Sequence, residues 1–542
     1  MNERKTYNGS TLDNDLTLEC DVVIVGTGAG GGYTAEILTN AGLRVVMLEK
    51  GGHYTPKTFS QKEGEAYPML YMDGGQQRTK DKGFIVFQGR SVGGGTTVNW
   101  TTSFRTPELT LRHWVDKYGL KSFAPETMAP HFEAVEKRLD IHTWEMLPPN
   151  ANNQAIAKGC EKLGYEWHLT KRNVNGCANT GLCGLGCPIN AKKGMLVTTI
   201  PSALDKGAVL VSCAEAVQIV HDGKRTTGVE ALAMDRFGNT PTGRRIRVNA
   251  KHVVVSAGAI RSPALLMRSK VPDPSGMTGK RTFLHPVSLS LAKMPDEVAG
   301  FRGAPQSVYS DHFWLPEGKL FGAARLGYKV ETAPVFPIFT AALVDKGFGP
   351  TSAALMKQFP FLQMAIALHR DGYNDHEKCG TVEISGDIGA SLDYPIDDYL
   401  MNSLVKSMLE IMEIQFAAGA EFVIPMHIDG MPLKSMAEAK TWMSSAPMGL
   451  MRMLAGSAHV MGGCQMGGDV KTSVVDEWGR HRAIENLSVI DGSVFPTSLG
   501  VNPQESIYAN ASKHGAAMAK ALACSTPTRL PRRPTRNPSA GD

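Results

Sequence analysis

The stretch 21-DVVIVGTGAGGGYTAEILTNAGLRVVMLEKG-51 predicts a strand, a glycine turn, a helix and a second strand. The run DVVIV is short and apolar, as expected for a parallel strand that is buried on both faces. Gly26, Gly28 and Gly31 follow it in a G-x-G-x-x-G pattern. In such a pattern the first glycine permits a tight turn, the second lets a pyrophosphate approach the backbone, and the third lets helix and strand pack closely. The helix N-terminus that comes next carries unpaired N–H groups suited to phosphate.

Glu49 ends the second strand of this unit, 18 residues after Gly31. A carboxylate at that place can accept hydrogen bonds from a ribose diol. A glycine loop that arises by chance is the alternative explanation of G-x-G-x-x-G alone. The strand, the helix and the terminal acid in register argue against it, so the stretch predicts a dinucleotide-binding unit. The pattern itself does not choose between FAD and NAD.

Three later segments bear on that choice. The first, 89-GRSVGGGTTVN-99, is either a flexible linker or a backbone that comes very close to a ligand. Its apolar flanks and its lack of linker polarity favour the close approach. The second, 252-HVVVSAGAIRSPALLMRSK-270, predicts a buried strand, a small-residue turn and a helix that begins near Ser262. The third, 487-LSVIDGSVFPTSLGVNPQESIYANASKHGAAMA-519, predicts a strand that ends at Asp491, a loop with prolines and an Ala-rich helix.

At these residues the chain resembles the glucose–methanol–choline (GMC) oxidoreductases, a family of FAD-dependent enzymes. The resemblance extends over nearly the whole chain, from about Asp21 to about Ala519. The residues that fit the first family signature are Gly89, Arg90, Val92, Gly93, Gly94, Gly95, Thr96 and Asn99. Those that fit the second are Gly258, Ala259, Ser262, Pro263, Leu265 and Leu266. Lys270 departs from that signature, since a glycine is usual there. The resemblance selects FAD over NAD.

The resemblance also implies an α/β fold, the GMC fold, in which a discontinuous Rossmann-like FAD-binding domain carries an inserted α+β substrate-binding domain. We expect the FAD-binding domain to comprise residues 15–120, 191–290 and 456–525, and the substrate-binding domain to comprise 121–190 and 291–455. The residues expected to bind FAD are Gly26, Gly28, Gly31, Glu49, Arg90, Gly93, Gly94, Gly95, Thr96, Asn99, Val217, Ala257, Gly258, Asp491, Gly492, Asn502 and Pro503.

Two segments near the C-terminal end carry a closer resemblance. The segments 459-HVMGGCQMG-467 and 500-GVNP-503 are similar to the cholesterol oxidase and long-chain alcohol oxidase branch, in which a His is paired with an Asn. His459 and Asn502 occupy the matching positions, so the resemblance implies that they are the catalytic pair. A histidine titrates near neutrality and suits a partner that takes or shares the hydroxyl proton. An Asn amide both donates and accepts, and therefore suits a group that positions the alcohol.

Each candidate catalytic histidine could instead have a purely structural role. His459 could be one of fifteen histidines satisfied by nearby backbone, but its glycine-rich flank and the GVNP loop argue against this. His285, in 279-GKRTFLHPV-287, also matches a family segment near the active site, and we interpret it as structural.

Three cysteines, Cys177, Cys183 and Cys187, are spaced C-x5-C-x3-C in 177-CANTGLCGLGCPINAKKG-194. Three thiolates on a short Gly-rich loop can converge on one iron cluster, and Cys-Pro is common after cluster ligands. The segment also resembles the one that holds a [3Fe–4S] cluster in GMC-type sugar dehydrogenase subunits, where the cluster passes electrons from FAD to a cytochrome partner. The alternatives are buried thiols in a tight loop, or a disulfide in an exported protein.

Two apolar segments, 332–369 and 443–454, bear on the substrate. If they line the site, the substrate is a long-chain, terpenoid, aromatic or sterol-like alcohol. If they form only core or a subunit interface, they say nothing about it. We favour an apolar substrate, because sugar sites need many hydrogen-bonding side chains.

Three functions remain for such a chain. The first is an FAD-dependent alcohol dehydrogenase or oxidase that acts on a hydrophobic alcohol, with oxygen, a quinone or a cytochrome as acceptor. The second is the flavin subunit of a multi-subunit dehydrogenase that passes electrons through the cysteine cluster. The third is a lyase, since the same fold hosts members in which FAD is not reduced.

Composition excludes other classes. A net charge of +5 over 542 residues gives no indication of nucleic-acid binding. The chain has no apolar run of about 18 residues that would span a membrane, and its first residues lack the apolar core of a signal peptide. We therefore expect a cytoplasmic protein that can contact the inner membrane peripherally. Residues 526–542 are basic and Pro-rich and are expected to form a disordered tail.

Overall fold

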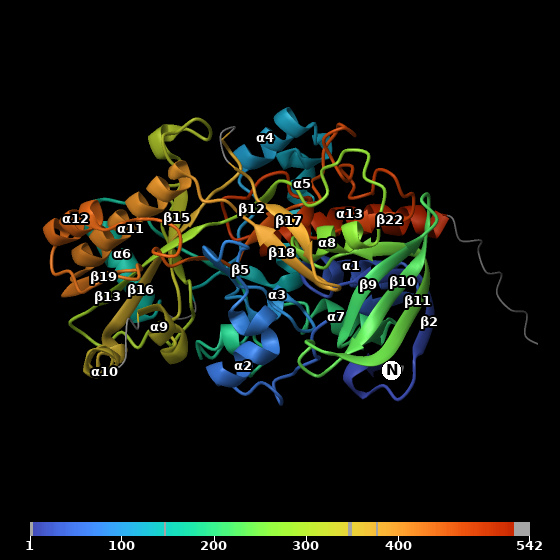
Figure 1. Ribbon diagram of the computed structural model, residues 1–542, viewed down its shortest axis with the longest axis horizontal. Helices are drawn as coiled ribbons and strands as arrows, with labels where there is room; N and C mark the ends of the chain where they lie inside the picture. The colour runs from blue at the N-terminus through green and yellow to red at the C-terminus, as the bar shows by residue number, and fades with distance from the viewer. Residues whose placement is uncertain (1–3, 146–147, 345–348, 375–377, 525–542) are drawn as a thin grey trace, which may run out of the picture.

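The chain folds around two large β-sheets, which lie at opposite ends of the molecule in Figure 1. The computed structural model describes residues 4–145, 148–344, 349–374 and 378–524. The expected disordered tail, 526–542, lies outside these residues. Within them, no helix is long and apolar enough to cross a membrane.

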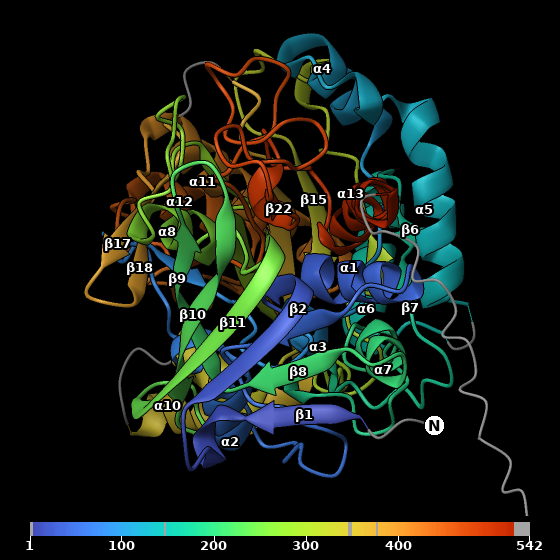
Figure 2. The same cartoon turned by 90° about the vertical axis from the view of Figure 1, so that its right-hand side faces the viewer.

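Apolar runs such as DVVIV form the first sheet, which has eight strands in the order β1-β8-β3-β2-β11-β10-β9 with β22 also paired to β11. These strands are β1 (Lys5–Asn8), β8 (Val209–Ser212), β3 (Val45–Leu48), β2 (Leu16–Val25), β11 (Pro241–Val255), β10 (Thr226–Met234), β9 (Ala214–His221) and β22 (Leu487–Val489). Along this sheet, β1, β8, β3, β2 and β11 are paired in parallel, and β22 pairs in parallel with β11. The last two strands, β10 and β9, are antiparallel to their neighbours. Figure 2 shows this sheet from its outer side.

The predicted strand–turn–helix unit joins this sheet to its covering helices. α1 (Ala29–Asn40) begins directly after the glycine turn and packs against α13 (Gln504–Cys524). Gly26 adopts a φ of 96°, and a Cβ there would lie 2.2 Å from the carbonyl oxygen of Ser256. A Cβ on Gly31 would lie 2.0 Å from the carbonyl oxygen of Gly26. Glycine is therefore required both for the turn and for the close approach of helix and strand.

The second sheet has the strand order β15-β16-β13-β20-β4, with β19 also paired to β13. Its strands are β15 (Tyr328–Thr332), β16 (Leu362–His369), β13 (Val287–Lys293), β20 (Ala455–Ser457), β4 (Phe84–Val86) and β19 (Phe422–Pro425). α6 (Ala151–Leu163) and α11 (Asp398–Ala418) cover one face, where Ala365 and Ala367 of β16 pack against them. Since side chains alternate along a strand, Ile366 and Leu368 point to the opposite face, away from α6 and α11.

Shorter elements connect these layers. The remaining helices are α2 (Glu63–Leu70), α3 (Gly95–Val98), α4 (Glu108–Tyr118), α5 (Pro125–Leu139), α7 (Thr199–Asp205), α8 (Arg261–Arg268), α9 (Pro337–Val344), α10 (Pro350–Lys357) and α12 (Met436–Ser445). The remaining strands form short antiparallel pairs, β12 (Thr282–Leu284) with β21 (Val460–Gly462), β14 (Val308–Tyr309) with β6 (His168–Leu169), β17 (Thr381–Ser385) with β18 (Gly389–Asp393), and β5 (Ile141–Thr143) with β7 (Lys171–Asn173).

The domain boundaries expected from the sequence stay a prediction, and two segments have packing partners on the other side of them. Residues 15–120 were expected to belong to the FAD-binding domain, yet β4 is hydrogen-bonded within the second sheet. Residues 121–190 were expected to belong to the substrate-binding domain, yet α5 packs against α13 on the first sheet. The physical reason is that the chain crosses between the sheets more often than the motifs reveal, and an apolar strand does not indicate which sheet it joins.

Lys270, the departure from the second family signature, occupies a left-handed position at the end of α8. Its φ is 55°, and its N–H donates to the carbonyl of Met267 while that of Val271 donates to the carbonyl of Leu266. This is the Schellman arrangement, in which glycine is favoured just after the helix. The signature's geometry is therefore preserved here with a residue that carries a Cβ.

We expect Lys270→Gly to stabilise the protein by about 0.5–1 kcal/mol. The left-handed conformation costs a residue with a Cβ about 1–2 kcal/mol, and the greater freedom of glycine in the unfolded chain offsets about 0.5–1 kcal/mol of the gain. Urea denaturation measures the difference. Lys270→Ala is the matched control and should leave the midpoint unchanged, because alanine keeps the Cβ. An equal gain from both variants would contradict the explanation.

Candidate active site

A cavity of about 420 Å³ lies between the two sheets and receives residues from both of them. The residues with an expected role in FAD binding or catalysis that line it are Gly26, Gly28, Glu49, Arg90, Gly94, Gly95, Thr96, Asn99, Ala257, Gly258, His459, Asp491, Gly492, Asn502 and Pro503. Gly31, in the first turn of α1, and Gly93, in the 89–99 segment, do not line it. Val217 is in β9, next to the lining residue Ala216, and does not itself line the cavity.

Two glycine loops meet at the floor of this cavity. Gly94 has a φ of 52°, and a Cβ on it would lie 2.7 Å from the Cα of Gly28. The N–H of Gly93 donates to Oγ1 of Thr27 at 3.0 Å, which ties the second loop to the first. The 89–99 segment is thus ordered against the first glycine turn and is not a flexible linker, while its predicted close approach to a ligand stays a prediction.

Glu49 joins the same assembly through its carboxylate. Oε2 accepts hydrogen bonds from the N–H and the Oγ1 of Thr27, at 3.1 and 2.6 Å, and Oε1 accepts from the N–H of Gly51 at 2.9 Å. Burial raises the pKa of Glu49 above its usual value. The carboxylate therefore holds the first glycine turn in place, while its expected contact with a ribose stays a prediction.

The glycines also leave room for a ligand. Gly28 has a φ of −66°, open to any residue, and a Cβ there would meet only the Cα of Gly94, at 4.0 Å. A Cβ on Gly95 would have no atom within 4 Å. Neither backbone conformation nor packing with the protein requires glycine at these two places. The missing Cβ atoms instead keep open a space that fits a dinucleotide beside the backbone.

Asp491 fastens the third segment to the second. Its Oδ2 accepts from the N–H of Gly258 at 2.8 Å and from the hydroxyl of Ser262 at 2.5 Å, and its Oδ1 accepts from the N–H of Ser493 at 2.8 Å. The turns after β11 and β22 are thereby held side by side at the edge of the cavity.

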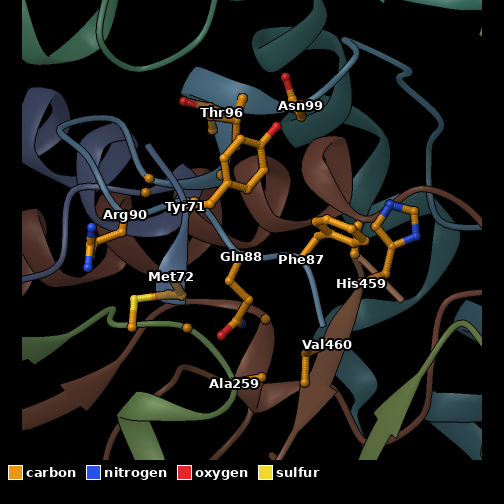
Figure 3. Close-up of a pocket in the computed structure, with 18 of the residues that line it drawn as sticks. Tyr71, Met72, Phe87, Gln88, Arg90, Thr96, Asn99, Ala259, His459 and Val460 are labelled. Carbon is orange, nitrogen blue, oxygen red and sulfur yellow. The ribbon is translucent and has the colours of Figure 1, made fainter. Parts of the chain in front are cut away.

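His459 enters the cavity just beyond the end of β20. Its Nδ1 lies 2.9 Å from Nδ1 of His285, which is 1% exposed and does not line the cavity. Burial lowers the pKa of His459 to about 4, so the ring is neutral at physiological pH. Figure 3 shows the ring of His459 projecting into the same space as that of Phe87, with Gln88 beside them.

Asn502 reaches the cavity from the loop before α13. Its Nδ2 donates to Oε2 of Glu331 at 3.3 Å, and its buried Oδ1 has no hydrogen-bond partner among the residues that the structure describes. Burial raises the pKa of Glu331 to about 7, although the hydrogen bond from Asn502 and the charge of Lys329 act in the opposite direction. The Asn502 side chain is thus anchored through nitrogen, with its oxygen left to accept.

Several residues of the site escaped the sequence patterns. Tyr71 and Phe87 line the cavity, and nothing distinguishes them in sequence from core aromatics. Gln504 accepts from Nδ2 of Asn99 at 2.7 Å and directly follows the GVNP segment, which could have indicated it. Glu331 gave no signal, because one acid in an apolar strand is not a motif.

The cysteine loop reaches the wall of the cavity. Gly184 and Leu185 line the cavity, and the hydroxyl of Tyr71 donates to the carbonyl of Gly184 at 2.7 Å. Cys177, Cys183 and Cys187 are partly exposed free thiols. In the described part of the chain, the one group of three potential ligands whose donor atoms lie within 4.8 Å of one another is Glu166, His168 and Asp311, and it contains no cysteine. The iron-cluster interpretation stays a prediction.

Comparisons with known proteins agree with this arrangement. Long-chain-alcohol oxidase FAO4A of Arabidopsis thaliana is 30% identical over 533 residues, covering 93% of this chain and 69% of that protein. Long-chain-alcohol oxidase FAO1 of the same plant is 29% identical over 535 residues, covering 94% and 66%, so the chain spans about two thirds of the length of these relatives. A formate oxidase structure from Aspergillus oryzae superimposes with a TM-score of 0.70 at 15% identity, covering 94% of this chain and 99% of that one, which shows a shared fold.

The family comparison covers most of the chain. The N-terminal GMC oxidoreductase family model matches residues 67–287, and the C-terminal one matches residues 377–511. Both contain residues that line the cavity, and the C-terminal one contains His459 and Asn502. The chain therefore belongs to the glucose–methanol–choline family of FAD-dependent oxidoreductases, enzymes that act on CH–OH groups, as its glycine signatures predicted.

Proposed function

We propose that this chain oxidises the CH–OH group of a hydrophobic alcohol while FAD occupies the cavity between the two sheets. The observation that carries the proposal is that His459 and Asn502 line the same cavity as Gly28, Gly94 and Gly95. A polar pair able to handle a hydroxyl thus shares one space with backbone suited to a dinucleotide. A spectrophotometric test follows directly, because an alcohol substrate should bleach the yellow flavin in the absence of oxygen.

The two halves of the reaction fall to different groups. Bound FAD supplies the hydride acceptor. The glycine loops, together with Arg90, Thr96, Asn99 and Asp491, would hold that cofactor. His459 and Asn502 would bind the hydroxyl, and the low pKa of His459 keeps its ring neutral and able to form a hydrogen bond with an alcohol.

The substrate class is inferred from the wall opposite the glycine loops. Leu289, Ile366 and Leu368 of the second sheet line it, together with Phe336 and Phe339 beside and within α9. This wall offers an alkyl or ring substrate dispersion contacts and hydrophobic burial, and few groups that could bind a sugar. Two relatives are named long-chain-alcohol oxidases. We therefore propose a long-chain or similarly apolar alcohol as substrate and oxygen as the acceptor.

A second candidate rests on the position of the cysteine loop. Gly184 and Leu185 bring this loop to the cavity wall, so an iron cluster on Cys177, Cys183 and Cys187 would lie next to the flavin site and could pass electrons to a quinone or a cytochrome. Iron and acid-labile sulfide in protein purified without air would support this candidate. An iron-free, purely yellow protein that reduces oxygen would exclude it.

Gly95→Ala should fold normally but bind FAD about tenfold more weakly or worse, because the new Cβ meets no protein atom yet enters the space kept for the cofactor. Flavin fluorescence on titration of the apoprotein measures the affinity. Gly64→Ala is the matched control, since its Cβ makes an ordinary 3.8 Å contact with Ile338 outside the cavity. Unchanged affinity in the Gly95 variant would place FAD elsewhere.

His459→Ala should keep its yellow FAD and lose substrate-driven bleaching by about 10²- to 10⁴-fold, because the hydroxyl loses its partner. Stopped-flow absorbance without oxygen measures the rate. His168→Ala, which removes an exposed histidine remote from the cavity, should bleach like the unaltered protein. Normal bleaching by the His459 variant would remove this residue from the reaction.

A series of primary alcohols tests the substrate class. Each added CH₂ buried against the apolar wall contributes about 0.8 kcal/mol, so kcat/KM should rise about fourfold per carbon until the wall is covered. Diols of equal length are the matched control and should be poorer substrates, because their second hydroxyl would be buried unpaired. A preference for sugars or polyols would contradict an apolar substrate.

A further inference from the structure

Strand register places two histidines opposite each other. β12 and β21 are antiparallel, with Leu284 paired to Val460. The next residues beyond that pair are His285 and His459, and the backbone N–H of His285 donates to the carbonyl of His459 at 3.2 Å. Their rings stand at 90° with the two Nδ1 atoms 2.9 Å apart. The short ladder thus brings the side chains into direct contact.

Only one hydrogen can lie between the two Nδ1 atoms, so one ring donates and the other accepts. Gly500 determines which, because its N–H donates to Nε2 of His285 at 3.1 Å. Nε2 of His285 must then be unprotonated, and a neutral imidazole in that state carries its hydrogen on Nδ1. His285 therefore donates to Nδ1 of His459, and neutral His459 carries its own hydrogen on Nε2.

Both rings are neutral in this environment. Burial, with a smaller contribution from His459, holds the pKa of His285 well below its usual value. A third buried histidine, His369, has its Nδ1 2.8 Å from the carbonyl oxygen of Pro286, and burial lowers its pKa to about 4. The neutral assignment of the hydrogens therefore applies to the whole cluster.

We propose that His285 is a positioning residue that holds neutral His459 with its hydrogen on Nε2, so that the ring offers the cavity a hydrogen-bond donor. The opposite tautomer of His459 would force a hydrogen onto Nε2 of His285, where it would face the N–H of Gly500. Both of these buried donors would then lack an acceptor. The free-energy cost of two unsatisfied donors disfavours this tautomer of His459.

The assignment gives the catalytic pair complementary roles, and this step rests on the proposed function. Nε2–H of His459 donates to the oxygen of the alcohol, while Oδ1 of Asn502, whose amide nitrogen is engaged by Glu331, accepts from the hydroxyl. An alcohol is both a donor and an acceptor, so this pair matches it. His459 therefore acts here as a hydrogen-bond donor that orients the alcohol, and the assignment concerns substrate binding before any transfer of a proton or hydride.

Nuclear magnetic resonance of the ¹⁵N-histidine-labelled holoenzyme tests the tautomer directly. His459 should show a protonated Nε2 and an unprotonated Nδ1, with its signals assigned by their loss from His459→Ala. A protonated Nδ1 on His459 would overturn the proposal. Because this measurement needs no turnover, the expected tautomer in a protein that oxidises no alcohol would refute the proposed function and leave the tautomer assignment standing.

Variants of His285 test its effect on the reaction. His285→Phe keeps a ring but removes both nitrogens, and should slow flavin reduction about 10- to 100-fold with little change in KM. His285→Asn should recover part of that loss, since an amide can still donate to Nδ1 of His459. His369→Gln controls for disturbance of the buried cluster and should keep the rate within about twofold. Equal losses in the Phe and Asn variants, with unchanged His459 signals, would show a purely structural role.

Discussion

The contact between the glycine turn 26–31 and the glycine loop 93–95 is the constraint on which the rest of the site depends. A Cβ on Gly94 would lie 2.7 Å from the Cα of Gly28. Thr27, itself held by Glu49, accepts a hydrogen bond from the N–H of Gly93 and so ties the two loops together. The cavity floor is therefore built from backbone, at a place where a dinucleotide needs backbone N–H groups. Asp491 adds the third segment by the same means.

The second sheet supplies the other half of the site through the face that points away from α6 and α11. α6 and α11 pack on small residues of β16, while the larger Ile366 and Leu368 face the cavity. The polar groups reach this apolar chamber from its rim. His459 and Asn502 each come from a loop, and each is anchored from behind by a buried partner, His285 or Glu331.

The sequence predicted the parts of the molecule in which backbone geometry restricts residue choice. Gly26 could be placed in a tight turn and Gly31 at a close contact of helix and strand, because few other residues tolerate such conformations or contacts. The apolar character of 332–369 predicted part of the cavity wall, whereas of 443–454 only Leu454 lines it. Tyr71 and Glu331 could not be predicted, since a buried aromatic or a single strand acid has many possible surroundings. The tie between His285 and His459 depends on strand register, which sequence alone did not show.

One pairing in the second sheet bears on how such a protein can diversify. β4 leads within three residues to Gly89 and the glycine loop, β20 leads within two residues to His459, and the two strands are paired in parallel. The glycine loop and His459 are thus carried by neighbouring strands at one side of the sheet, while β15 and β16 lie at the other. Substitutions on the distant strands can reshape the chamber without disturbing the distance between the glycine loop and His459. Residues beside the glycine loop and His459 can therefore stay unchanged while residues on β15 and β16 of the same sheet vary.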